Sequence, residues 1–275
     1  MPVLLGALAS GLIGVSDYFG RYASRRAQAM TSVGTAFVGG LGITLVLVLV
    51  VPSTITSADL LLGAVSGVLI AIAISSMWHS LAVSSSAIAS PIVAAFTALG
   101  PLTYGFATGE RPTIAVAIGI AVAVAGLLLA VIVPQTVENI GAGIAYAVLG
   151  GLAFTVAIVL LGRTDVDSGM WPAVTQRAAA LLFMLMVTRA RRIPQILPRP
   201  LRLAGLAGGI AGGLGMASFI AGVQRGPLGE VSVAGSLYPV VTIALAVIFD
   251  DDTLRWWQAV GIAAVLAGTT LITIG

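Results

Sequence analysis

The polar side chains inside long apolar runs are the residues of this sequence that could do chemistry. Arg177 lies about two turns into such a run, directly after Gln176, and its guanidinium can bind a carboxylate or a phosphate through two parallel hydrogen bonds. A central charged side chain costs roughly 2.5–3.5 kcal/mol on membrane-insertion scales, so Arg177 needs an explanation. Either Arg177 and Gln176 line a substrate cavity, or Arg177 is satisfied by carbonyl groups or a carboxylate and fixes helix packing.

Asp17 is the acidic counterpart and lies one turn before the end of the first apolar run. Arg21 follows it at i+4, the spacing at which opposite charges meet on a helix surface. This spacing favours a local ion pair. The alternative is that Asp17 is the carboxyl that couples transport to protons, since ionisable residues within membrane spans commonly mark such pathways.

Aromatic and imidazole side chains within the spans are further candidates for lining a cavity. His79 follows Trp78 near the end of the third apolar run, and it is the only histidine of the sequence. A lone histidine cannot build a metal site, so these two residues either pack at an interface or line the cavity. Three other aromatic residues are predicted to face the cavity: Tyr18, Phe154 and Tyr238.

Small residues at regular spacing indicate close helix contacts. Gly205, Gly209 and Gly213 recur every four residues, and without a Cβ they let two helix backbones approach each other. We predict that they serve helix packing, with a flexible joint for rocking motions as the alternative. Pro239 directly follows Tyr238 and can bend its helix, as a gating helix would require.

The missing residue types exclude several kinds of enzyme. All 13 basic residues are arginine, and there is neither lysine nor cysteine. This excludes a P-loop lysine, a Schiff-base lysine, a thiolate nucleophile and a cysteine-based metal site. An intramembrane serine hydrolase would need His79 beside a serine such as Ser218, but the Gly-x-Ser-Gly motif is absent. We therefore expect no enzyme, no cofactor and no metal, with the hydrolase as the disfavoured alternative.

The composition of the chain shows which elements must position these residues. Of its 275 residues, 59% are hydrophobic and only 8% are charged, whereas soluble proteins carry about 25% charged residues. This predicts an all-α integral membrane protein in the cell (inner or plasma) membrane. The net charge is only +3 and most arginines flank apolar runs, so the expected partners are membrane lipid and a small-molecule substrate, and no nucleic acid.

The apolar runs predict ten transmembrane helices, because each is close to the roughly 20 residues that a span requires. Together they leave no room for a soluble domain. The predicted spans are 3–20, 30–51, 60–82, 86–107, 113–133, 141–162, 170–188, 202–222, 230–249 and 255–274.

An internal repeat divides these spans into two sets of five. Shifting the sequence by 142 residues aligns 117–132 with 259–274, and eight of the sixteen aligned pairs are identical. Five is odd, so the second copy must cross the membrane in the opposite sense. We therefore predict two inverted five-helix repeats, 1–133 and 141–275, with a substrate site near the bilayer midplane between them.

The ends of the two repeats resemble a known family. Gly109-Glu110-Arg111 precedes a helix with two spaced glycines, and Asp250-Asp251-Asp252 occupies the corresponding place in the second repeat. The segment 237–242, Leu-Tyr-Pro-Val-Val-Thr, is similar to the ninth helix of the same family. These features resemble the drug/metabolite transporter superfamily, EamA-type, although the Asp-rich turn departs from the usual pattern. The resemblance covers essentially the whole chain.

The resemblance implies a ten-helix permease that works by alternating access and exports small metabolites such as amino acids. A multidrug permease, or a permease for nucleosides or other metabolites, is the alternative within this fold. No nucleotide-binding motif is present, which leaves proton coupling or facilitated diffusion. We expect a monomer or a weak homodimer.

The arginines and the resemblance favour opposite orientations in the membrane. Nine arginines lie in the connections after the odd-numbered spans and three in the other connections, with Arg177 inside a span. The positive-inside rule then places both termini outside. Members of the resembling family usually have both termini in the cytoplasm.

Overall fold

The computed structural model describes residues 1–24, 26–83, 86–132, 140–249 and 255–274, and within these ranges the regular structure is helical. The first five helices are α1 (Pro2–Ser24), α2 (Ala29–Val50), α3 (Ser57–Val83), α4 (Ser86–Ala107) and α5 (Ile114–Ala130). They are followed by α6 (Ile140–Gly162), the 3₁₀ turn η1 (Val166–Ser168), α7 (Trp171–Ala190), α8 (Arg199–Val223), α9 (Leu228–Gly235), α10 (Tyr238–Phe249) and α11 (Trp256–Ile274).

The predicted all-α membrane fold is confirmed. Among the described residues, eight helical segments are long and apolar enough to cross a membrane, and two shorter apolar helices accompany them, Ile92–Ala107 and Ile114–Ala130. Each of the ten predicted apolar runs corresponds to one of these segments, with α9 and α10 together forming the ninth. The protein is a multi-pass membrane protein.

The ninth span differs from its prediction because it is not one continuous helix. The apolar run 230–249 predicts a single span, whereas α9 ends at Gly235 and α10 begins at Tyr238. Proline has no N–H, so Pro239 cannot donate the helical hydrogen bond to the carbonyl of Gly235 four residues earlier. The backbone N–H of Ser236 still closes the last turn of α9 by donating to the carbonyl of Ser232 at 2.9 Å. Hydropathy does not register this interruption, because both helices are apolar.

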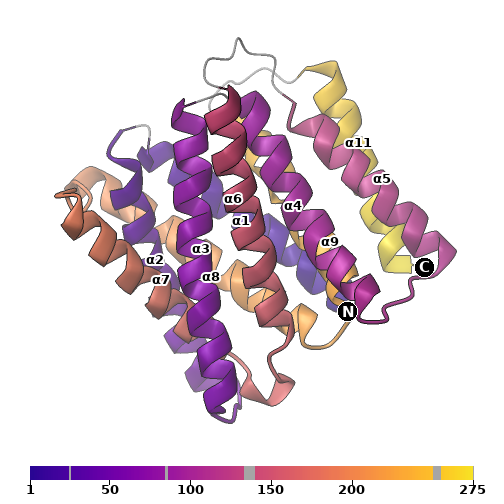
Figure 1. The fold of residues 1–275 in the computed structure, drawn as a ribbon, viewed down its shortest axis with the longest axis horizontal. Coiled ribbons are helices and arrows are strands. Elements are labelled where there is room, and N and C mark those ends of the chain that lie inside the picture. The colour runs from indigo at the N-terminus through magenta and orange to yellow at the C-terminus, as the bar shows by residue number, and fades with distance from the viewer. Residues whose placement is uncertain (25, 84–85, 133–139, 250–254, 275) are drawn as a thin grey trace.

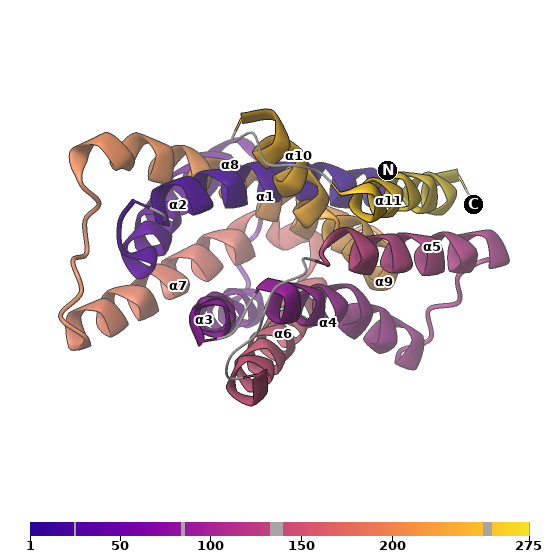
Figure 2. The same cartoon turned by 90° about the horizontal axis from the view of Figure 1, so that it is seen from above.

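The helices pack in pairs that join distant parts of the sequence (Figures 1 and 2). Helix α1 packs along α8, α3 packs along α6, and α2 contacts both α7 and α8. Helices α5 and α11 lie side by side at one edge of the molecule. Glycines allow this last contact, because a Cβ on Gly126 would lie only 2.7 Å from the carbonyl oxygen of Gly261.

Several connections share one face of the bundle, which we call the Glu110 face. It carries the connections 108–113, 163–170 and 224–227. Polar contacts tie these connections to one another and to neighbouring helices. Gln224 donates its Nε2–H to the carbonyl of Asp165 at 2.9 Å, and the buried Asp59 carboxylate of α3 accepts from the Ser168 hydroxyl.

Candidate functional site

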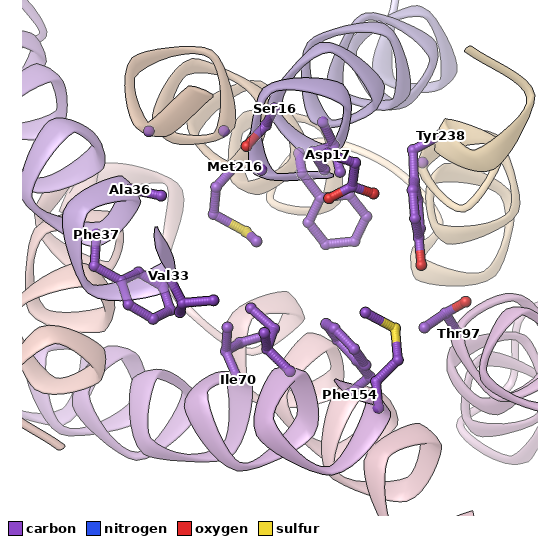
Figure 3. Close-up of a pocket in the computed structure, with 18 of the residues that line it drawn as sticks. Ser16, Asp17, Val33, Ala36, Phe37, Ile70, Thr97, Phe154, Met216 and Tyr238 are labelled. Carbon is purple, nitrogen blue, oxygen red and sulfur yellow. The ribbon is translucent and has the colours of Figure 1, made fainter. Parts of the chain in front are cut away.

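A cavity of about 180 Å³ lies among the helices, and nine of them contribute to its wall: α1, α2, α3, α4, α6, α7, α8, α9 and α10. The described residues that line it come from both predicted repeats. Figure 3 shows Asp17 and Tyr238 on one side, facing Ile70 and Phe154 across the cavity. Val33, Phe37 and Met216 make much of the remaining wall apolar.

Arg177 is one of the polar residues that reach this cavity. Its Nη2–H donates to the carbonyl of Gly212 at 2.7 Å, while its Nε is buried without a hydrogen-bond partner. The guanidinium carbon lies 5.7 Å from the centre of the Phe37 ring. Only 9% of the residue is exposed. Arg177 therefore combines a packing contact with hydrogen-bonding capacity that the described residues do not use, in a side chain that lines the cavity.

Gln176 points elsewhere and does not line the cavity. It is fully buried, and its Nε2–H donates to the Ser66 hydroxyl at 3.0 Å. That hydroxyl donates in turn to the carbonyl of Ala157 at 3.1 Å, so the chain of bonds joins α7, α3 and α6. Consecutive helical residues are about 100° apart, since a helix has 3.6 residues per turn. The structure thus separates two neighbours that the sequence suggested would act together.

Asp17 lines the cavity, and the local ion pair expected from its spacing to Arg21 is not formed. Among the described side chains, none makes an ion pair or hydrogen bond with the Asp17 carboxyl. Arg21 lies one turn further along α1 and is not part of the cavity lining. The spacing prediction was wrong here because Asp17 faces the centre of the bundle, whereas i,i+4 pairing stabilises charges on an exposed helix surface.

The aromatic candidates separate into two groups. Phe154 and Tyr238 line the cavity. Tyr18 does not, because its ring packs against Phe19 and Phe249 at centroid distances of 6.0 and 5.9 Å. The side chains of Trp78 and His79 lie outside the described residues, although the preceding Met77 lines the cavity.

The three spaced glycines bring α8 against its neighbours. A Cβ on Gly209 would overlap the carbonyl oxygen of Ala36 on α2, and one on Gly213 would lie 2.9 Å from the Cα of Gly40. A Cβ on Gly205 would lie 2.9 Å from Cδ1 of Leu197. Gly209 also forms part of the cavity wall. Pro239 lies in the first turn of α10, next to the interruption between α9 and α10.

Sequence reasoning missed Ser232 of α9. Its hydroxyl oxygen is buried without a hydrogen-bond partner, and the residue lines the cavity with an exposed fraction of 1%. A serine inside an apolar run is not distinctive, because its hydroxyl commonly bonds to a carbonyl of its own helix. Its significance comes from its position one turn before the interruption, where α9 meets the cavity.

Comparisons with known proteins agree with this architecture. The model of the EamA-like transporter family matches residues 141–274. A crystal structure of a protein that is 16% identical superposes with a TM-score of 0.79, covering 99% of this chain and 98% of the other. This likeness concerns the fold. No match was found among curated proteins. Residues 141–274 of this multi-pass membrane protein are therefore an EamA-like transporter family domain.

Proposed function

We propose that this protein is a secondary transporter of small zwitterionic metabolites such as amino acids, and that it exports them by alternating access. The observation that carries the proposal is the composition of one cavity wall: the carboxyl of Asp17 and the guanidinium of Arg177 both reach a cavity that is otherwise largely apolar. A zwitterionic amino acid carries an ammonium group that can pair with Asp17 and a carboxylate that can pair with Arg177. An apolar side chain on the amino acid can pack against the rest of the cavity wall.

Arg177 is the proposed binding residue for the substrate carboxylate. Arg177 lines the cavity, and its contact with Gly212 holds the guanidinium plane in place. Hydrogen bonds between a guanidinium and a carboxylate are among the strongest that side chains make. Exclusion of water by Phe37, Ile70 and Phe154 strengthens such a bond further, because the local dielectric constant falls.

Asp17 is the proposed exchange site for protons and substrate ammonium groups. A carboxylate at membrane depth is costly unless it takes up a proton or binds a cation. Asp17 has no ion-pair partner among the described side chains. Proton uptake or binding of a substrate ammonium group would therefore offset the cost of its charge, and the two compete for the same carboxyl. Competition at one carboxyl supports coupling of outward substrate movement to inward proton movement.

The helix pairing supports the division into inverted repeats 1–133 and 141–275. Helix α1 packs on α8, and their repeat counterparts α6 and α3 pack on each other. Likewise α2 packs on α8 while their counterparts α7 and α3 make a contact. A two-fold axis between the halves would produce matched pairs of this kind. Two such halves can rock about a fixed central site, which is the basis of alternating access.

Transport is tested with purified protein in proteoliposomes. We expect leucine to exchange across the membrane faster than in empty vesicles, and a proton gradient to drive its accumulation. Isoamylamine and isocaproate, which lack the carboxylate and the amine respectively, should move more slowly than leucine. No flux of leucine, or of any other amino acid, above empty vesicles would contradict the proposed substrate class.

Replacement of Asp17 by asparagine tests the coupling role. Asparagine keeps the size of the side chain but cannot carry a proton, so we expect leucine accumulation to lose its dependence on the proton gradient. Ser16→Ala, which alters the adjacent cavity residue, should keep that dependence. The measurement is initial leucine flux across a series of pH values on each side. An unchanged pH profile in Asp17→Asn would assign Asp17 a structural role.

A further inference from the structure

The first half of the chain caps a helix of the second half through Glu110. Its Oε1 accepts the backbone N–H of Leu228 at 2.6 Å, and its Oε2 accepts the N–H of Gly229 at 3.0 Å. Leu228 and Gly229 begin α9. The first N–H groups of a helix have no partner within the helix, and a carboxylate there makes charge-assisted bonds that the helix dipole strengthens.

No local residue replaces this cap. Pro227 precedes α9 and makes no side-chain cap bond. The fit is also close, because a Cβ on Gly229 would lie 2.9 Å from Oε2 of Glu110 and 2.8 Å from Cδ1 of Leu102. The carboxylate of Glu110 is therefore held at the N-terminus of α9 by two directed bonds and by the absence of a side chain at Gly229.

Helix α9 connects this contact to the proposed substrate cavity. It has eight residues, which corresponds to a length of about 12 Å at 1.5 Å per residue. Glu110 binds its first turn, while Ser232 and Gly235 of its second half line the cavity. Because the helix ends at the interruption before α10, it can move at its first turn without carrying the whole ninth span with it.

An apolar cluster fills the space between the cavity and the Glu110 face. It joins the ends of α6 and α8 to the beginnings of α7 and α9, and its residues at this face are Leu161, Ala173, Val223, Leu228 and Val231. All five are buried. Met216 and Phe219 belong both to this cluster and to the cavity wall. The cluster thus closes the path from the cavity to this face.

We propose that Glu110 is a latch that holds the Glu110 face closed, and that this face opens only when the carboxylate releases the N-terminus of α9. The latch joins the two halves of the chain, so it breaks when the halves move apart. Its release frees Leu228, which is capped by Glu110 and packed in the apolar cluster. The inference rests on alternating access in the proposed function, but its test requires no transported substrate.

The test measures access to the cavity with a single cysteine. The chain has no native cysteine, so Ser232→Cys provides one reactive thiol at the cavity wall. Arg163→Cys, at an exposed residue of the Glu110 face, identifies the side of the vesicle from which a membrane-impermeant thiol reagent approaches. The labelling rate of Ser232→Cys is then compared with and without a second substitution at Glu110.

We expect Glu110→Ala to raise labelling from the Glu110 face by about tenfold, because the substitution removes both charge-assisted bonds that cap the first turn of α9. Glu110→Gln retains one acceptor oxygen and should give a smaller increase, and it serves if Glu110→Ala does not fold. Glu230→Gln is the matched control, because it removes a carboxylate from the same small cavity of about 80 Å³ without touching the cap.

Three results would overturn the latch. Labelling from the Glu110 face is unchanged in a folded Glu110 variant, or Glu230→Gln raises it equally, or the increase occurs only from the opposite face. The transport proposal is judged separately by flux. A protein that moves no amino acid can still show the accessibility change, and a transporter of leucine can lack it.

Discussion

Arg177→Ala is expected to reduce leucine transport by about 30-fold or more, because truncating one partner of a buried charge pair typically costs 2–5 kcal/mol. Isoamylamine has no carboxylate, so its transport should fall by less than about threefold, an effect of under 1 kcal/mol. Isocaproate should be affected as strongly as leucine. The measurement is initial flux of the three compounds in the same preparation of proteoliposomes, so that differences in protein amount cancel.

Two further variants separate substrate binding from packing. Arg177→Lys keeps the charge but loses the planar fork, and it should retain part of the preference for carboxylates. Gln176→Ala removes a buried side chain outside the cavity, and it should lower stability without changing the ratio of leucine to isoamylamine flux. If Arg177→Ala reduces all three compounds equally while the protein stays folded, Arg177 acts through its contact with Gly212.

Gly209→Ala is expected to cause a large loss of stability. Its Cβ would overlap the carbonyl oxygen of Ala36, so α8 and α2 must separate at the cavity wall. Overpacking of a close contact costs typically 1–3 kcal/mol, and a backbone oxygen cannot move aside as a flexible side chain can. We therefore expect about 3 kcal/mol of destabilisation, or a decrease in Tm of about 6–12 °C.

The matched control for Gly209→Ala is a glycine on α2 without close neighbours. A Cβ on Gly42 meets nothing within 4 Å, and alanine has the higher helix propensity, so Gly42→Ala should leave Tm unchanged or raise it slightly. Thermal unfolding of detergent-solubilised protein, followed by tryptophan fluorescence, distinguishes the two. Equal Tm values for both variants would show that α8 and α2 do not depend on this contact.

Asp17 and Arg177 show how differently two charges at membrane depth can be accommodated. Arg177 uses the carbonyl of Gly212 for part of its hydrogen-bonding capacity. Asp17 lacks such a contact among the described side chains and faces the cavity instead. The transport and pH experiments therefore give separate signatures for these residues: Arg177 should govern carboxylate preference, and Asp17 should govern the response to protons.

The predicted spans agree with the structure to within a few residues, except at the ninth. Apolar length and turn residues determine where a span begins and ends, and both are local properties of the sequence. The interruption at Ser236 and Leu237 is also local in origin, because Pro239 removes one helical bond. From the sequence alone, Pro239 predicts only a bend, because a proline in a membrane helix often bends the helix without interrupting it.

The sequence by itself determined that this is a multi-pass helical membrane protein, where its spans lie, and which polar residues lie within them. Only the tertiary structure decided that Asp17, Arg177 and Ser232 share a cavity while Gln176 and Tyr18 do not. It also decided that Glu110 caps α9, 118 residues away. The physical reason is that hydropathy depends on neighbouring residues in the chain, whereas the direction of a side chain depends on helix rotation, which packing against distant helices sets.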